Sequence, residues 1–282
     1  MNDKRTYIRA VLDILFFIIV YLLLQLLCQG IATIIFSNIH GTGISLQALQ
    51  KAAAEMSDDG RWMTMISVIS SVITIILYYR LKWSPLGRSY IRSRPWAALV
   101  WVVIATIGTL LPAEWIYEKS GLIMPEQYER LFESIMKEPW GYAAIGLMVP
   151  LAEEMVFRGA VLRTLLQVIP SKRHWTAIII SALLFGIAHF NIAQGVHAFA
   201  IGLLLGWMYY RTRSIVPGLV FHWANNSIAY ALYNFFPQMN DGQLIDFFHG
   251  STRLMAGGLF FSIMIFIPAI FQLYRLLKKA GE

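Results

Sequence analysis

The chain has 282 residues, of which 57% are hydrophobic and only 14% charged, whereas a soluble globular domain carries about a quarter charged residues. Its net charge of +7 comes from Lys and Arg in short segments between apolar blocks, which is typical of membrane topology and argues against a nucleic-acid partner. One cysteine, Cys28, excludes an internal disulfide and a CxxC metal site.

Eight apolar segments approach or exceed the length of about 20 helical residues that crosses a hydrocarbon core. They lie near 12–36, 62–79, 96–117, 140–163, 175–190, 196–210, 214–236 and 254–276, and the first is interpreted as a retained helix. The sequence therefore predicts an all-α fold, a polytopic membrane helical bundle of about eight transmembrane helices. The fifth and sixth segments are short and closely joined, which predicts a tight helical hairpin.

The chain is expected to form one integrated membrane domain in three parts. Residues 1–139 supply three helices and an outer amphipathic segment, residues 140–236 a core that contains the fourth to seventh apolar segments, and residues 237–282 the last helix. In the outer segment 118–139, apolar residues recur at helical spacing, which predicts a helix on the membrane surface. Such a helix serves either as a lid or as a plain connector, and an interfacial connector is the preferred interpretation.

The distribution of basic residues predicts the orientation. With both termini in the cytoplasm, the inner segments hold 16 of the 23 Lys and Arg residues and the outer segments six. We therefore expect an integral membrane protein of the bacterial inner membrane with cytoplasmic termini.

Three charged residues lie inside the fourth apolar segment, in the stretch LAEEMVFRG at 151–159. Each such charge costs at least about 2.5 kcal/mol near the bilayer centre, so these side chains must face protein or a water-filled cavity. Glu154 and Arg158 are four residues apart on one helix face, which predicts an ion pair. Glu153 lies about 100° around the helix and is left free for chemistry. The alternative is a purely structural triad.

Two further segments carry polar residues at matching depth. The fifth reads ALLFGIAHFN with His189, and the seventh LVFHWANNSI with His222 and Asn226. At 1.5 Å per residue, Glu153, His222 and His189 lie roughly 15, 13 and 21 Å from the cytoplasmic ends of their segments. All three depths fall near the middle of a core about 30 Å thick. These residues are therefore expected to line one water-containing cavity, with Glu154 turned away towards Arg158.

Three motifs follow one another on successive segments. EEMVFR fits EExxxR, FGIAH fits FxxxH and HWANN fits HxxxN. With these motifs the chain resembles the CAAX-processing and bacteriocin-processing (CPBP, or Abi) family of intramembrane proteases, which includes the Rce1-type endopeptidases. The resemblance covers roughly residues 140–236.

The resemblance implies hydrolysis of a peptide bond within the membrane. By position, Glu153 and His189 activate a water, and His222 and Asn226 stabilise the oxyanion. In the same reading, Glu154 and Arg158 hold these groups in place. The complete set of candidate catalytic residues is Glu153, Glu154, Arg158, His189, His222 and Asn226.

Glu153, His189 and His222 are also candidate zinc ligands, because two histidines and a glutamate make a zinc triad with an open position. The chain has no HExxH, and the family is described both as metalloproteases and as glutamate-dependent proteases. The question of whether the protein binds zinc therefore stays open. His197, at the start of the sixth segment, is given an interfacial role in preference to a place in the cavity.

The expected partners are the lipid bilayer and a membrane-embedded or lipid-modified peptide or protein, such as a CAAX-like prenylated substrate or a bacteriocin. Two other classes compete with the endopeptidase. One is a non-catalytic membrane scaffold or bacteriocin self-immunity protein, which needs none of these polar residues. The other is a transporter with a Glu/His relay, but the chain shows no inverted repeat and no broken helix pair.

Overall fold

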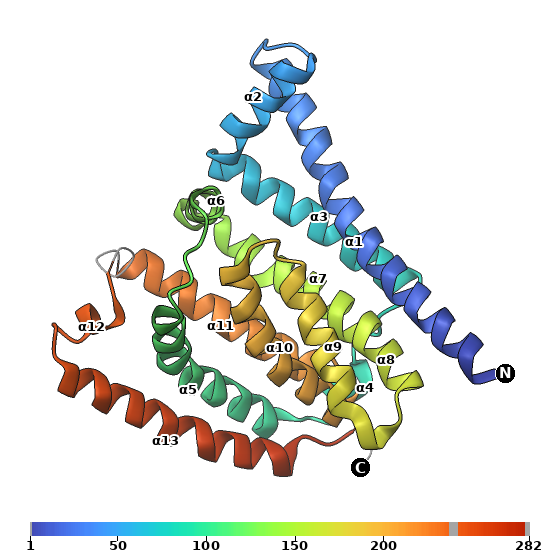
Figure 1. Ribbon diagram of the computed structural model, residues 1–282, viewed down its shortest axis with the longest axis vertical. Helices are drawn as coiled ribbons and strands as arrows, with labels where there is room; N and C mark the ends of the chain where they lie inside the picture. Colours follow the sequence, from blue (N-terminus) through green and yellow to red (C-terminus); the bar gives the residue numbers. More distant parts are fainter. Residues whose placement is uncertain (1, 237–241, 280–282) are drawn as a thin grey trace.

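The computed structural model describes residues 2–236 and 242–279, and these form helices and their connections without any strand (Figure 1). The predicted all-α bundle is therefore confirmed. The helices are α1 (Asn2–Ile39), α2 (Leu46–Ser57), α3 (Gly60–Arg80), α4 (Arg88–Arg92), α5 (Trp96–Ser120), α6 (Glu126–Lys137), η1 (Ala143–Met148), α7 (Val149–Glu154), η2 (Met155–Leu162), α8 (Arg163–Val168), η3 (Ser171–Arg173), α9 (His174–Ile187), α10 (Ile192–Thr212), α11 (Val216–Phe235), α12 (Leu244–Phe247) and α13 (Thr252–Leu276).

Five helices within the described residues are long and apolar enough to cross a membrane. They are the greater part of α1, α3, α5, α10 and α13, which coincide with the first, second, third, sixth and eighth predicted segments. The other three predicted segments are helical too, but α9 has only 14 residues and the fourth changes its helix type along its length. The total of eight spans stays a prediction.

The fourth predicted segment is a single helical path with two wide turns. η1 and η2 are π-helical, and α7 lies between them with the two glutamates at its end. π-Helical turns are rare and occur often at functional sites. Here each has a backbone carbonyl that accepts a bond from another helix: Ile145 from Asn226 at 3.0 Å, and Phe157 from Ser181 at 2.9 Å. The wide turns thus fix α9 and α11 against this central path.

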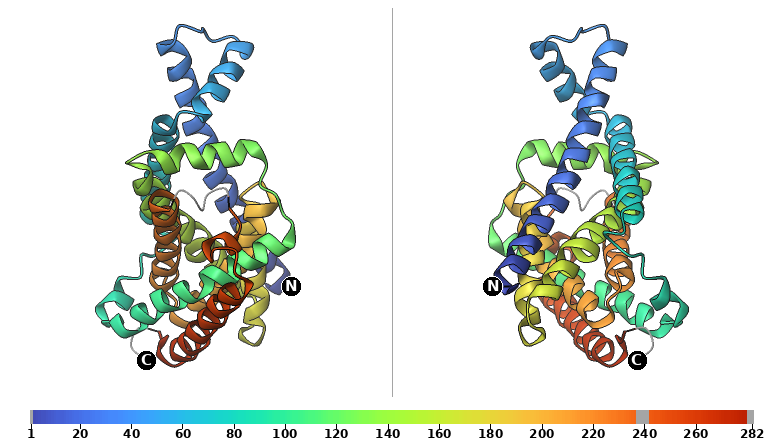
Figure 2. Two further views of the ribbon diagram at one scale, coloured as in Figure 1. Left: turned by 90° about the vertical axis from the view of Figure 1, so that its left-hand side faces the viewer. Right: turned by 90° about the vertical axis from the view of Figure 1, so that its right-hand side faces the viewer.

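η2 is the centre of the largest apolar core. All eight of its residues are buried, and side chains of α1, α3, α9 and α10 pack around it. A second apolar cluster joins α5, α10, α11 and α13. A third lies where α1, α2, α3 and α6 meet, at the base of the arm that α1, α2 and α3 extend beyond the rest of the bundle (Figures 1 and 2).

The predicted hairpin of the fifth and sixth segments is confirmed as α9 and α10. A Cβ at Gly186 would lie 2.6 Å from the carbonyl oxygen of Gly195, so only glycine permits this approach of the two helices. Further along α10, a Cβ at Gly206 would lie 2.9 Å from Ile178, which also indicates close packing. α9 ends at Ile187, earlier than predicted, so the residues that follow it form the turn of the hairpin.

The outer segment 118–139 does contain an amphipathic helix, α6. Ile135 and Met136 are buried against the neighbouring helices, and Ser134 donates a hydrogen bond to the carbonyl of Ser57. The C-terminal half of α6 is thus fixed to the arm. Residues 237–241, which hold the predicted domain boundary, and 280–282 lie outside the described residues.

Candidate active site

The predicted ion pair between Glu154 and Arg158 is present. Nη1 of Arg158 lies 2.9 Å from Oε1 of Glu154, and both side chains are buried, with 1% and 0% of their surface exposed. Glu154 ends α7 and Arg158 lies in η2, so the change of helix type preserves the i, i+4 contact. Loss of either charge would lower the stability of the fold, because an unpaired buried charge is strongly destabilising.

The guanidinium of Arg158 also joins α9 and α10. Its central carbon lies 4.3 Å from the ring centroid of Phe185, a cation–π contact, and Nη2 donates to the carbonyl of Gly202 at 3.4 Å. A Cβ at Gly202 would lie 3.3 Å from this Nη2 and 3.0 Å from Ala182. The GxxxG pattern of α10 therefore serves close helix packing, as the sequence indicates, and also makes room for the arginine.

A glycine of α11 makes room for the paired carboxylate. A Cβ at Gly218 would lie 2.8 Å from Oε2 of Glu154, so any side chain there would have to displace the carboxylate. The sequence does not reveal this role, because it depends on which face of α11 meets α7.

His222 lies between the two glutamates. Its Nε2 is 3.6 Å from Oε2 of Glu153, and its Nδ1 is 3.4 Å from Oε1 of Glu154. Glu154 thus faces Arg158 as predicted, but it also contacts His222, which was not predicted. The two carboxylates differ in access to solvent: Glu154 is fully buried, while 12% of the Glu153 side chain is exposed. The pair therefore combines one fixed carboxylate with one that water can reach.

A tyrosine from outside the motif segments lies beside Glu153. Tyr21 of α1 is buried, packs edge-on against Phe157 at 5.9 Å between centroids, and interacts electrostatically with Glu153. α1 therefore forms one wall of the site. No motif in the sequence indicates this contribution.

His189 lies in the hairpin turn rather than in a membrane helix, because α9 ends two residues before it. Its Nδ1 is 2.9 Å from the carbonyl oxygen of Phe185, an acceptor, so Nδ1 carries the hydrogen in the neutral ring. The lone pair of Nε2 then remains available. The ring centroid of Phe185 lies 5.0 Å from that of His189 and 6.1 Å from that of His222, so both histidines pack edge-on against this ring.

Asn226 lies one helical turn after His222 on α11. Its Nδ2 donates to the carbonyl of Ile145, and its Oδ1 accepts from Asn225 at 3.3 Å. These bonds fix the direction of the amide. Because an amide nitrogen carries two hydrogens, one of them is still available after the bond to Ile145.

His197 lies near the same group of residues. It interacts electrostatically with both His189 and His222, from the first turns of α10. His197 is exposed, so the choice between an interfacial role and a place in the cavity stays open. The only signal available in the sequence is its position eight residues after His189, on the second helix of a hairpin.

The residues present do not fit a zinc triad in this arrangement. Within residues 2–236 and 242–279, no three His, Cys, Asp or Glu side chains converge closely enough to hold a metal ion. Both nitrogens of His222 face carboxylates, and no ion pair within 4.0 Å joins Glu153 to His189 among those residues.

The N-terminal half of α6 reaches the hairpin turn. The hydroxyl of Tyr128 donates to the carbonyl of Phe190 at 3.3 Å, next to His189. This bond joins the outer amphipathic segment to the site, while the rest of α6 is fixed to the arm. The choice between lid and connector stays open on these contacts.

Comparison with known proteins finds a family match for the central third of the chain. Residues 136–228 match the family model described as type II CAAX prenyl endopeptidase Rce1-like, which confirms the resemblance over this segment. The match supports a CAAX-type peptide hydrolase within an integral membrane protein. No curated protein and no solved structure matches the chain.

Proposed function

We propose that this chain, with an Rce1-like segment at residues 136–228, is an intramembrane endopeptidase whose general base is Glu153. The observation that carries the proposal is the position of His222 between a buried, paired carboxylate and an accessible one. Only the accessible carboxylate is free to exchange a proton with water. The other fixes the histidine, as an acidic residue orients histidine in other hydrolytic sites.

The first step is attack by water. Glu153 accepts a proton from the water, and the water oxygen forms a bond to the carbonyl carbon of the substrate. His189 orients the same water by accepting its second hydrogen at Nε2, the nitrogen left free by the bond to Phe185. This role agrees with the lack of a direct contact between Glu153 and His189 among the described residues, since a water would lie between them.

The second step stabilises the oxyanion and expels the amine. A protonated imidazole donates through both nitrogens; we assign Nδ1 of His222 to Glu154 and Nε2 to the developing oxyanion. The second amide hydrogen of Asn226 completes the pair of donors. Glu153 then returns its proton to the leaving nitrogen as the C–N bond breaks, so no proton is gained or lost overall.

The proposed substrate is a membrane-associated peptide or protein of the prenylated CAAX class, cleaved in the bacterial inner membrane with both termini of the enzyme in the cytoplasm. Support comes from the family match and from a site built on helices with apolar outer faces. Lipid modification would hold such a substrate at the depth of the site.

The test is the substitution Glu153→Gln, assayed by cleavage of a farnesylated CAAX reporter peptide in proteoliposomes. We expect cleavage to fall to the background level, because an amide cannot accept the proton. The melting temperature in detergent should change little, since the ion pair of Glu153 among the described residues is the long 3.6 Å contact to His222. The matched control is Glu133→Gln, which removes a carboxylate from an exposed pair with Lys137 and should cleave normally.

Full cleavage by Glu153→Gln would exclude Glu153 as the base. A non-catalytic scaffold would leave the reporter uncut by the wild type as well. Comparison of membrane proteomes from cells with wild type or Glu153→Gln then identifies the natural substrate as the protein that accumulates uncut.

A further inference from the structure

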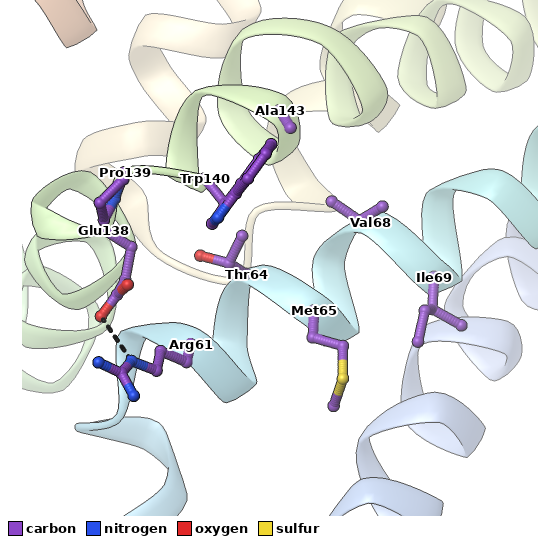
Figure 3. A pocket seen from close by; sticks show the side chains of 9 residues that line it. All are labelled: Arg61, Thr64, Met65, Val68, Ile69, Glu138, Pro139, Trp140 and Ala143. Carbon is purple, nitrogen blue, oxygen red and sulfur yellow. Dashed lines mark ion pairs between the residues drawn. The ribbon is translucent and has the colours of Figure 1, made fainter.

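A crevice lies on the side of the bundle remote from the α9–α10 hairpin, between α3 and the segment that joins α6 to η1. It encloses about 630 Å³, within the range of small-molecule sites (Figure 3). Its two walls come from the first three turns of α3 and from residues 138–143. None of the candidate catalytic residues lines it.

The α3 wall has a polar end and an apolar end. Its lining residues follow helical spacing along one face of α3, in the order Arg61, Thr64, Met65, Val68 and Ile69. From the first to the last this face is about 12 Å long at 1.5 Å per residue. The charge lies at the start and only aliphatic side chains and a thioether at the end. This gradient from polar to apolar matches an amphiphilic ligand, which has a polar headgroup and an apolar chain.

The polar end holds an ion pair with unused bonding capacity. Nε of Arg61 lies 3.9 Å from Oε1 of Glu138, too far for a hydrogen bond (Figure 3). The Arg61 side chain is 85% exposed and that of Glu138 25% exposed. Neither side chain has a hydrogen bond among the residues that the structure describes. A positive and a negative group are therefore presented side by side to the surroundings.

Two glycines fix this end of the crevice. A Cβ at Gly60 would lie 2.0 Å from the carbonyl oxygen of Ser134 and 2.7 Å from Cγ of Glu138. A Cβ at Gly141 would lie 1.9 Å from the carbonyl oxygen of Ile135. The close approach of α3 to the end of α6 therefore sets the distance between the two charges.

A hydroxyl without a partner lies one turn deeper. Thr64 is buried, and its Oγ1 has no hydrogen-bond partner among the described residues. Figure 3 shows it between Arg61 and Trp140, on the side of the crevice. A buried hydroxyl that lacks a bond costs about 1–3 kcal/mol, so an acceptor at this depth would stabilise the protein.

We propose that this crevice binds a glycerophospholipid with a primary ammonium headgroup, phosphatidylethanolamine. The phosphate is placed on Arg61, whose planar fork of donors matches it, and the ammonium on Glu138. An ester carbonyl accepts from Thr64, and an acyl chain lies along Val68 and Ile69. Trp140, 78% exposed at the rim, lies at the level of the headgroup, where tryptophan is favoured.

The zwitterion follows from the charges of the site. An anionic lipid such as phosphatidylglycerol would gain Arg61 but meet the Glu138 carboxylate. A choline headgroup has no hydrogen to donate to that carboxylate. Phosphatidylglycerol offers this carboxylate only neutral hydroxyls, so of the three lipids phosphatidylethanolamine alone pairs both charges with hydrogen-bonding groups of opposite charge.

The test compares three lipids with identical acyl chains on the full-length protein in detergent. Phosphatidylethanolamine, phosphatidylcholine and phosphatidylglycerol are titrated, and binding is measured by native mass spectrometry and by the shift in melting temperature. We expect phosphatidylethanolamine to bind about tenfold more tightly than the other two, the typical worth of one hydrogen bond to a charged group.

Three variants separate the contacts. Arg61→Ala should weaken all three lipids by about tenfold or more, because each carries the phosphate. Glu138→Gln should bind the three lipids alike, since only the ammonium contact is lost. Thr64→Val should weaken all three by the same small factor. The matched control is Arg130→Ala, which removes an exposed arginine of α6 outside the crevice and should keep the wild-type preference.

Equal binding of the three lipids by the wild type, or undiminished binding of all three lipids by Arg61→Ala, would overturn the proposal. Displacement of bound phosphatidylethanolamine by a farnesylated peptide would also overturn it, because the crevice would then belong to the substrate site. If Arg61→Ala does not fold, Arg61→Lys serves instead: it keeps the charge but loses the fork, and the proposal requires weaker binding of every lipid.

Discussion

Replacement of Arg158 by alanine tests the structural half of the site, the pairing that holds Glu154. In the protein the two groups are 2.9 Å apart and essentially unexposed, so Arg158→Ala leaves a carboxylate without its cation in a buried position. Removal of one partner of a buried pair costs about 3–5 kcal/mol. The cation–π contact with Phe185 is lost as well. For a chain of this size the melting temperature should fall by about 10 °C.

The assay is thermal unfolding of purified protein in one detergent, with a double variant as the decisive control. Arg158→Met with Glu154→Gln removes both charges, so it should be more stable than Arg158→Ala, which strands one of them. Arg163→Ala, which loses only a weak bond to the carbonyl of Trp83, should melt close to the wild type. A melting temperature of Arg158→Ala within about 2 °C of the wild type would refute the assignment.

Three further predictions concern the chemistry and its support. Purified, active protein should contain well under one equivalent of zinc by elemental analysis, and chelators should not lower its activity. One equivalent of zinc together with reversible inhibition by chelators would instead support the zinc triad. Gly218→Ala should lower cleavage at least tenfold and destabilise by about 1–3 kcal/mol, because the new methyl group displaces the Glu154 carboxylate; Gly257→Ala, with open space around it, should do neither. Asn226→Ala should lower kcat by about 10²–10³ with little change in KM, as loss of an oxyanion donor does, and an equal loss in KM would contradict that role.

The contacts within one helix were predictable from the sequence. The i, i+4 rule predicted the pair of Glu154 with Arg158, and helical offset distinguished it from Glu153. The common depth of the polar residues on the fourth, fifth and seventh segments stays a prediction, and His189 lies in the turn after α9 rather than on a helix. The fold class followed from the apolar blocks and from the placement of Lys and Arg.

The contacts between helices were not predictable, because they depend on rotation and helix type. The contact of His222 with Glu154 needs the Gly218 face of α11 to meet α7, which no periodicity reveals. The π-helical turns of η1 and η2 shift the register of the central path, and an ideal 3.6-residue repeat does not contain them. The place of His189 in a turn followed from the end of α9, a boundary that apolar composition does not mark.

The shortness of α9 has a consequence for the surrounding lipid. With 14 residues the helix is about 21 Å long, roughly 9 Å less than the thickness of a typical hydrocarbon core. Where α9 crosses the bilayer as the sequence predicts, the bilayer beside the hairpin turn would thin, or headgroups and water would reach down to the turn. Hydrophobic mismatch at one short helix would thus open a shallow path for water to His189, and a thicker bilayer would make that path longer.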